Sequence, residues 1–199
     1  MKAAFVVFDG LTFLDIIGPY DALSRLKTMK LMADFGWDFC ATTPQVRDEE
    51  GLTVSVSKVA QPLADYDLIV VAGGFGTRRL QHDEAFLEWL RSAARVPLKT
   101  SVCTGSLLLG AAGFLRGKRA TTHPGAFAEL VPFCGEAVNE RIVDEGDVVT
   151  AGGVSAGIDL GLHLVERIAG REARDRAARQ MDYPWRAPAA GPERAAAKS

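Results

Sequence analysis

An uninterrupted apolar segment at residues 68–71, Leu-Ile-Val-Val, is the feature of this sequence that most constrains its fold. A strand with one face in water alternates apolar and polar residues, whereas a strand covered on both faces is apolar throughout, as in parallel sheets. The segment leads directly into Ala72-Gly73-Gly74-Phe75-Gly76, where the glycines predict the end of the strand and a turn. We therefore expect a parallel sheet with helices packed on both of its faces.

Short β-rich segments alternate with helical segments along the chain, which is the pattern of an α/β domain. The expected strands are 3–8, 37–42, 68–72, 98–103 and 148–151, and the expected helices are 15–26, 84–95, 106–115, 126–131 and 155–169. We expect one domain over residues 1–183. A Pro- and Ala-rich tail over residues 184–199 follows it, with Tyr183-Pro184-Trp185 as a candidate clasp on a partner subunit.

Composition and charge restrict the classes of partner. The chain has 199 residues, 48% of them hydrophobic, and is long enough to bury a full core. Its 23 basic and 25 acidic side chains form no block of like charge, which argues against nucleic acid or an anionic membrane and favours a small-molecule partner. The 3 cysteines show no paired spacing, so neither a disulfide framework nor a metal site is expected. With an N-terminal apolar run too short for a signal peptide, these features predict a cytoplasmic protein.

Cys103 lies where an apolar run gives way to Thr104-Gly105-Ser106 and a helical segment, so its thiol is expected at a strand-to-helix elbow. Enzymes with α/β folds place nucleophiles at such turns, where the helix start offers free N–H groups. The positive end of the helix dipole is expected to lower the thiol pKa and favour the thiolate. Gly105 allows the helix to approach the preceding strand closely. The alternative is that Cys103 is a small buried hydrophobic residue.

Asp15 places a carboxyl group between apolar neighbours near the start of the first expected helix. One interpretation is an N-cap or first-turn acid that stabilises the helix dipole. The other is a carboxyl group that faces the Cys103 thiolate; desolvation and like-charge repulsion would then raise its pKa and let it carry a proton near neutral pH. Asp9 fits a turn with Gly10, and Asp21 fits an exposed helical face, so neither is a candidate.

Thr104 and Gly74 are the candidates for orienting the reacting groups. The glycine loop lacks the lysine of a P-loop and the spacing of a dinucleotide fingerprint, which argues against nucleotide binding. Because glycine lets the backbone approach closely, the amides of Gly74 and Thr104 are expected to form a two-donor pocket for developing negative charge. The alternative for Thr104 is a helix cap through its hydroxyl. Since threonine cannot accept a proton from a thiol, Asp15 is the nearest candidate acceptor.

His123, Phe75, Gly153 and Val154 are the expected pocket walls. His123 ends a short β-like run and is either a base or a packed histidine. Gly153 and Val154 belong to a second glycine-rich turn that either walls the pocket or is purely structural. The loops 9–19, 73–78 and 103–106 each follow a strand and are expected to converge at the carboxyl edge of the sheet.

With these residues assembled, the chain resembles the ThiJ/PfpI superfamily, a group related to class I glutamine amidotransferases that has a cysteine nucleophile elbow. Within it, the motifs are most similar to those of the isocyanide hydratases. The matching stretches are 14–19, 72–76, 100–107, 119–123 and 152–159. Two positions depart from the pattern: Ala72 stands where many relatives have proline, and Pro124 where close relatives often have tryptophan. The second departure is expected to change a pocket wall.

The resemblance implies a flavodoxin-like sandwich, a homodimer, and no metal or organic cofactor. It assigns Cys103 as the nucleophile, Asp15 as its acid/base partner and Thr104 as the residue beside the nucleophile. The implied reaction is hydration of an isocyanide to an N-substituted formamide through a covalent thioimidate. Two alternatives remain open: a glyoxalase-like enzyme that acts on methylglyoxal with His123 as proton shuttle, and a non-catalytic small-molecule sensor related to the ligand domains of AraC-type regulators.

Overall fold

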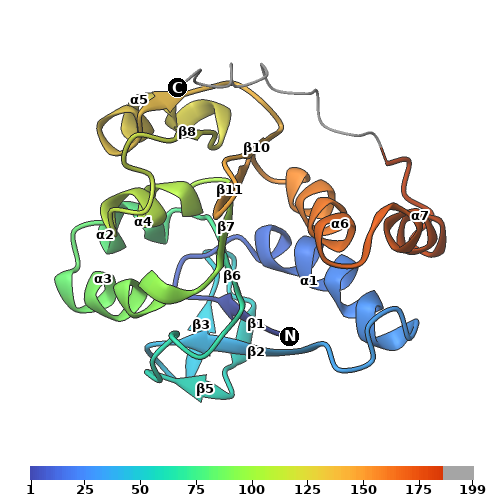
Figure 1. Cartoon of the computed structure of the whole chain (residues 1–199). Coiled ribbons are helices and arrows are strands. Elements are labelled where there is room, and N and C mark those ends of the chain that lie inside the picture. Colours follow the sequence, from blue (N-terminus) through green and yellow to red (C-terminus); the bar gives the residue numbers. More distant parts are fainter. Residues whose placement is uncertain (186–199) are drawn as a thin grey trace.

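A computed structural model describes residues 1–185, and its centre is a seven-stranded sheet with the order β10-β11-β7-β6-β1-β2-β5 (Figure 1). The strands of this sheet are β1 (Lys2–Val6), β2 (Gly36–Ala41), β5 (Lys58–Val59), β6 (Leu68–Val71), β7 (Leu98–Val102), β10 (Ile142–Asp144) and β11 (Val148–Ala151). All neighbours pair in parallel except the edge strand β10, which is antiparallel to β11. The α/β architecture with a mainly parallel central sheet is thus confirmed.

Helices cover both faces of the sheet, as the apolar character of β6 predicts. They are α1 (Phe13–Thr28), α2 (Gly76–Leu80), α3 (Glu84–Arg91), α4 (Gly105–Ala111), α5 (Phe127–Leu130), α6 (Ala156–Ala169) and α7 (Arg171–Gln180). In Figure 1, α1, α6 and α7 lie on one side of the sheet and α2, α3 and α4 on the other. Every residue of β6 is fully buried between these layers.

Small residues let α1 pack closely against α6. A Cβ atom added at Gly18 would lie 3.0 Å from the backbone nitrogen of Ile158, and one at Gly161 would lie 2.7 Å from the Cβ atom of Ala22. Contacts this short leave no room for a larger side chain at either glycine. The start of α1, which carries Asp15, is thereby fixed relative to the turn that precedes α6.

The predicted central elements match the structure, whereas several short elements are not predicted. The strand 148–151 coincides with β11, and the other predicted strands differ from β1, β2, β6 and β7 by one or two residues at their ends. The predicted helix 106–115 stops earlier, at Ala111, because Gly113 has a φ of 93°. The elements missed are α2, α7, β5, β10 and two small two-stranded sheets, which are β3 (Gln45–Arg47) with β4 (Thr53–Ser55) and β8 (Arg119–Ala120) with β9 (Glu136–Ala137).

The described part of the chain ends just after α7. Tyr183 donates its backbone N–H to the carbonyl of Ala178, and the Trp185 ring lies 5.3 Å from the guanidinium of Arg174. The tail predicted over residues 184–199 otherwise lies outside the described residues, and both its contact with a partner subunit and the homodimer stay predictions. Within residues 1–185, no helix is long and apolar enough to cross a membrane.

We predict that Gly105→Ala lowers the free energy of unfolding by about 1–3 kcal/mol, the usual cost of overpacking a close contact. The added Cβ atom would lie 2.5 Å from the carbonyl oxygen of Val71 and 2.6 Å from that of Ala72, so α4 would have to move away from β6. Urea denaturation followed by circular dichroism measures the change. Gly36→Ala is the matched control, because nothing lies within 4 Å of its added Cβ atom. Equal stability of the two variants would contradict the packing argument.

Candidate active site

Cys103 occupies a strained elbow between the end of β7 at Val102 and the start of α4 at Gly105. Its φ is 55°, in the left-handed region that residues with a Cβ atom rarely adopt. Its backbone N–H is shared between the carbonyl oxygens of Ala151 at 3.0 Å and Gly152 at 3.1 Å. These bonds to the end of β11 stabilise the strained conformation, as expected where surrounding structure holds a functional residue in place.

Asp15 lies in the first turn of α1, fully buried, with its carboxyl group facing Cys103. Its Oδ2 atom accepts the N–H of Gly73 at 3.2 Å, while Oδ1 has no hydrogen-bond partner among the described residues. A Cβ atom at Gly73 would lie 2.7 Å from Oδ2 and 2.8 Å from the Cβ of Cys103, so only glycine fits between the two side chains. Thr12 is the N-cap of the helix, so Asp15 is not its cap.

Burial raises the pKa of Asp15 to about 7, against the weaker opposing effects of the Cys103 thiol and the Gly73 amide. The sequence-based expectation of a raised carboxyl pKa agrees with this direction and with desolvation as its main cause. At neutral pH the carboxyl group is therefore poised between its protonated and ionised forms, which is the condition for efficient proton transfer.

The pKa of the Cys103 thiol is raised to about 12, so the prediction of a lowered thiol pKa is wrong. Burial is the main cause and the Asp15 carboxylate the second, and they outweigh the N–H and hydroxyl of Thr104, which favour the thiolate. Because the two acids face each other, they titrate as a pair. The pair loses its first proton near pH 7 and keeps its second up to strongly alkaline pH.

The Thr104 hydroxyl binds the glycine loop and does not cap α4. It accepts the N–H of Gly74 at 3.0 Å and lies 3.1 Å from the Gly74 carbonyl oxygen. The Gly74 amide is therefore occupied, and the expected two-donor pocket made of Gly74 and Thr104 is not what the geometry shows. The Thr104 backbone N–H remains directed at the Cys103 sulfur. These contacts fix the elbow against the loop that follows β6.

His123 lies beside Cys103 but on the solvent side of the site. Its Nδ1 atom accepts the N–H of Gly125 at 3.1 Å, so the ring is oriented by its own turn. A Cβ atom added at Gly153 would lie 2.7 Å from Cδ2 of His123 and 2.8 Å from the Cys103 sulfur. Gly153 thus separates the two side chains, and the ring presents a carbon edge to that glycine. The alternative of a buried, packed histidine does not apply, because His123 is exposed.

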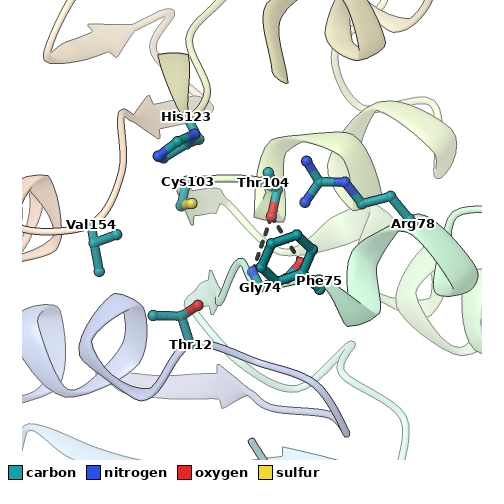
Figure 2. Close-up of a pocket in the computed structure, with 8 residues that line it drawn as sticks. All are labelled: Thr12, Gly74, Phe75, Arg78, Cys103, Thr104, His123 and Val154. Atoms are coloured by element: carbon teal, nitrogen blue, oxygen red, sulfur yellow. Dashed lines mark hydrogen bonds between the residues drawn. The ribbon is translucent and has the colours of Figure 1, made fainter. Parts of the chain in front are cut away.

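A cavity of about 180 Å³ lies beside this elbow, with Cys103 on its wall (Figure 2), whereas Asp15 and Gly153 are not among its lining residues. The lining residues are Thr12, Gly74, Phe75, Arg78, Cys103, Thr104, His123 and Val154. The three loops expected to converge each contribute to this lining, and Phe75, His123 and Val154 are among the predicted walls. Pro124 instead lines a neighbouring cavity with Gly152 and Gly153, so the expected change of wall at Pro124 falls outside this pocket.

Thr12 and Arg78 line the pocket but are not among the candidates chosen from the sequence. Thr12 lies within the loop 9–19, and Arg78 is the last residue of the loop 73–78. The missed signal is that Gly76 begins a helix, α2, which places Arg78 over the pocket instead of in an open loop. Figure 2 shows the Arg78 guanidinium directed toward Thr104 and the Phe75 ring.

Asp9 and Asp21, which the sequence excludes as candidates, and the second cysteine Cys40 lie away from the pocket. Asp9 is in a turn with Gly10 and accepts the backbone N–H of Arg47 at 2.9 Å, and Asp21 pairs with Arg25 at 2.7 Å. Cys40 is buried 3.4 Å from the Tyr66 hydroxyl. Within residues 1–185, no group of three or more His, Cys, Asp or Glu side chains is arranged to hold a metal ion.

Comparison with known proteins identifies the family. Residues 1–167 match the DJ-1/PfpI family. The chain is 38% identical over 185 residues to the isonitrile hydratase of Pseudomonas putida, covering 92% of this chain and 78% of that protein. It is 34% identical over 124 residues to the HTH-type transcriptional regulator CdhR of Pseudomonas aeruginosa, covering 60% of this chain and 36% of the regulator.

A solved structure of a ThiJ/PfpI family protein from Pseudomonas syringae has a TM-score of 0.83 and 27% sequence identity, covering 99% of this chain and 78% of that chain. On the family match, the sequence identity and this structural similarity, the chain belongs to the DJ-1/PfpI family.

Proposed function

We propose that this protein hydrates isocyanides, also called isonitriles, to N-substituted formamides. The observation that carries the proposal is the buried Asp15 carboxyl group facing the Cys103 thiol, a pair that holds one proton at neutral pH. The terminal carbon of an isocyanide accepts a nucleophile and then requires a proton, and this pair supplies both. The 38% identity to an isonitrile hydratase supports the same assignment.

The first half of the reaction forms a covalent adduct. The Cys103 sulfur, as thiolate, attacks the terminal carbon, and a carbon–sulfur bond forms. Asp15 gives its proton to that carbon, so the adduct is a neutral thioimidate and the carboxyl group becomes ionised. The Thr104 N–H directed at the sulfur keeps the thiolate oriented toward the cavity.

The second half hydrolyses the thioimidate. Ionised Asp15 takes a proton from water as the oxygen adds to the same carbon, and the proton then passes to the substrate nitrogen. The tetrahedral adduct returns its hydroxyl proton to Asp15 as the carbon–sulfur bond breaks. The N-substituted formamide leaves, and both the thiolate and the protonated carboxyl group are restored. The sum is the addition of one water to one isocyanide.

A second candidate function is small-molecule sensing without catalysis, and the similarity to the regulator CdhR favours it. A sensor requires the pocket but not turnover. The glyoxalase-like alternative assigns His123 as the proton shuttle, and the Nδ1 atom of His123 already accepts the N–H of Gly125, which does not favour that role. Turnover of an isocyanide by the wild-type protein therefore separates the leading proposal from both.

We predict that Cys103→Ala abolishes formamide formation and that Asp15→Asn lowers kcat by roughly 10²–10⁴-fold, the usual contribution of a positioned acid or base. Absorbance with an aryl isocyanide as substrate follows the reaction. Cys134→Ala is the matched control, because Cys134 is a half-buried thiol outside the pocket and its loss should leave turnover unchanged. Full activity in Cys103→Ala would refute the proposal.

We predict that kcat/KM for a neutral isocyanide rises with pH through about 7 and then stays level. Below pH 7 both Asp15 and Cys103 are protonated, so no thiolate is available as nucleophile. Above pH 7 the pair has lost one of its two protons, and the remaining proton can lie on the carboxyl group beside a thiolate. In Asp15→Asn the rise should move to alkaline pH, since burial alone raises the pKa of Cys103. A profile that is flat from pH 5 to 9 in the wild type would contradict this assignment.

We predict that Asp15→Asn gains stability relative to the wild type as pH rises. The folded-state pKa of about 7 exceeds 3.8, the ordinary pKa of an aspartate in the unfolded chain, so the folded protein binds more protons between these values and loses stability as pH increases from about 4 to 7. The difference approaches an upper limit of roughly 4 kcal/mol above pH 7. Urea unfolding of both proteins at pH 4.5 and pH 8 measures it. A stability difference that does not change with pH would show that Asp15 ionises freely in the folded protein.

A further inference from the structure

Arg78 is the one side chain lining the pocket that is charged at every physiological pH. It reaches the pocket from α2, with about one third of its side chain exposed. None of the other lining residues has a carboxyl group, so no carboxylate on the wall competes for Arg78. A fixed positive charge in a small cavity beside the candidate nucleophile is not required by the hydration of a neutral isocyanide.

The contacts of Arg78 leave one edge of its guanidinium open. Its Nε atom donates to Oε2 of Glu129 at 3.0 Å and its Nη2 atom donates to Oε1 at 2.9 Å. Nη1 takes part in neither bond and makes no other hydrogen bond among the described residues. The guanidinium carbon lies 5.5 Å from the centre of the Phe75 ring, which supports the group from one side.

Such a guanidinium is prepared to bind a second carboxylate. Arginine presents its donors in a rigid planar fork, and each edge of the fork matches the two oxygens of a carboxylate. Glu129 occupies the edge formed by Nε and Nη2 and fixes the plane of the group. The opposite edge, formed by Nη1 and the second hydrogen of Nη2, remains for a ligand. Figure 2 shows this end of Arg78 directed toward Thr104 and Phe75, over the cavity.

We propose that Arg78 makes the pocket selective for small isocyanides that carry a carboxylate close to the isocyano group. The inference rests on the hydratase function proposed above and specifies its substrate class. A cavity of about 180 Å³ that is lined by both Cys103 and Arg78 restricts the ligand to a short molecule spanning the two. The ionised Asp15–Cys103 pair would repel such an anion, so the attraction of Arg78 is what admits it.

The test compares two substrates that differ only in charge, the isocyanoacetate anion and methyl isocyanoacetate. We expect the wild type to favour the anion in kcat/KM by about tenfold or more, which corresponds to one hydrogen-bonded charge pair. Arg78→Met should remove this preference, mainly by raising KM for the anion, and should change kcat/KM for the ester by much less. A wild-type preference for the ester, or an equal loss for both substrates in Arg78→Met, would overturn the proposal.

Two further variants separate binding of the substrate from a structural role of Arg78. Arg79→Met removes the same charge from the next residue, which lies outside the pocket and is largely exposed. This variant should leave kcat/KM unchanged for both substrates. Glu129→Gln keeps the side-chain shape but removes the negative charge that offsets Arg78, so the preference for the anion should persist or increase. If Arg78 only joins α2 to α5, Glu129→Gln and Arg78→Met would lower kcat/KM for both substrates by the same factor, and the proposal would be wrong.

Binding measurements distinguish failure of this inference from failure of the hydratase function. N-formylglycine has the shape of the anionic product, and its methyl ester is the neutral counterpart; titration calorimetry measures their binding to the wild type and to Arg78→Met. If neither isocyanide is hydrated but N-formylglycine binds in an Arg78-dependent manner, the anion site stands without the reaction. If the isocyano ester is hydrated but neither assay depends on Arg78, the reaction stands and the selectivity proposal is overturned.

Discussion

The rest of the site depends on one contact, the buried Asp15 carboxyl group against the Cys103 thiol. Two acids held together away from water cannot both ionise near neutral pH, so one proton is retained between them. The arrangement costs stability, because Oδ1 of Asp15 has no hydrogen-bond partner among the described residues. The packing of α1 against α6 and the fully buried strand β6 offset that cost and hold the pair together.

Much of the fold could be predicted from the sequence, because the central strands and the long helices carry their own signals. Leu68–Val71 is apolar throughout since helices cover both faces of β6. The edge strand β5 has only two residues, and β10 has three, so neither is long enough to show a period. These short segments are extended because they pair with a neighbouring strand, and the local sequence carries no information about that partner.

The position of the candidate site was predictable from the sequence, and so was the raised pKa of Asp15, but the raised pKa of Cys103 was not. Loops that follow parallel strands meet at one edge of the sheet, so the convergence of the loops carrying Asp15, Gly74 and Cys103 follows from topology. The direction of the Cys103 pKa depends on how deeply the thiol is buried, and no local pattern states that depth. The hydrogen bond of the Gly74 amide was not predictable from a local pattern either, because its acceptor is the Thr104 hydroxyl from a different loop.

The shared hydrogen bond from the Cys103 amide to Ala151 and Gly152 has a consequence for how the protein acquires its reactive thiol. The strained backbone at Cys103 costs about 1–3 kcal/mol, and the compensating carbonyl oxygens come from residues almost fifty positions later in the chain. A chain still emerging from the ribosome lacks those acceptors until β11 has been made and paired with β7. The elbow therefore takes its final shape, with the Cys103 thiol held against Asp15, only when β11 has completed its pairing with β7.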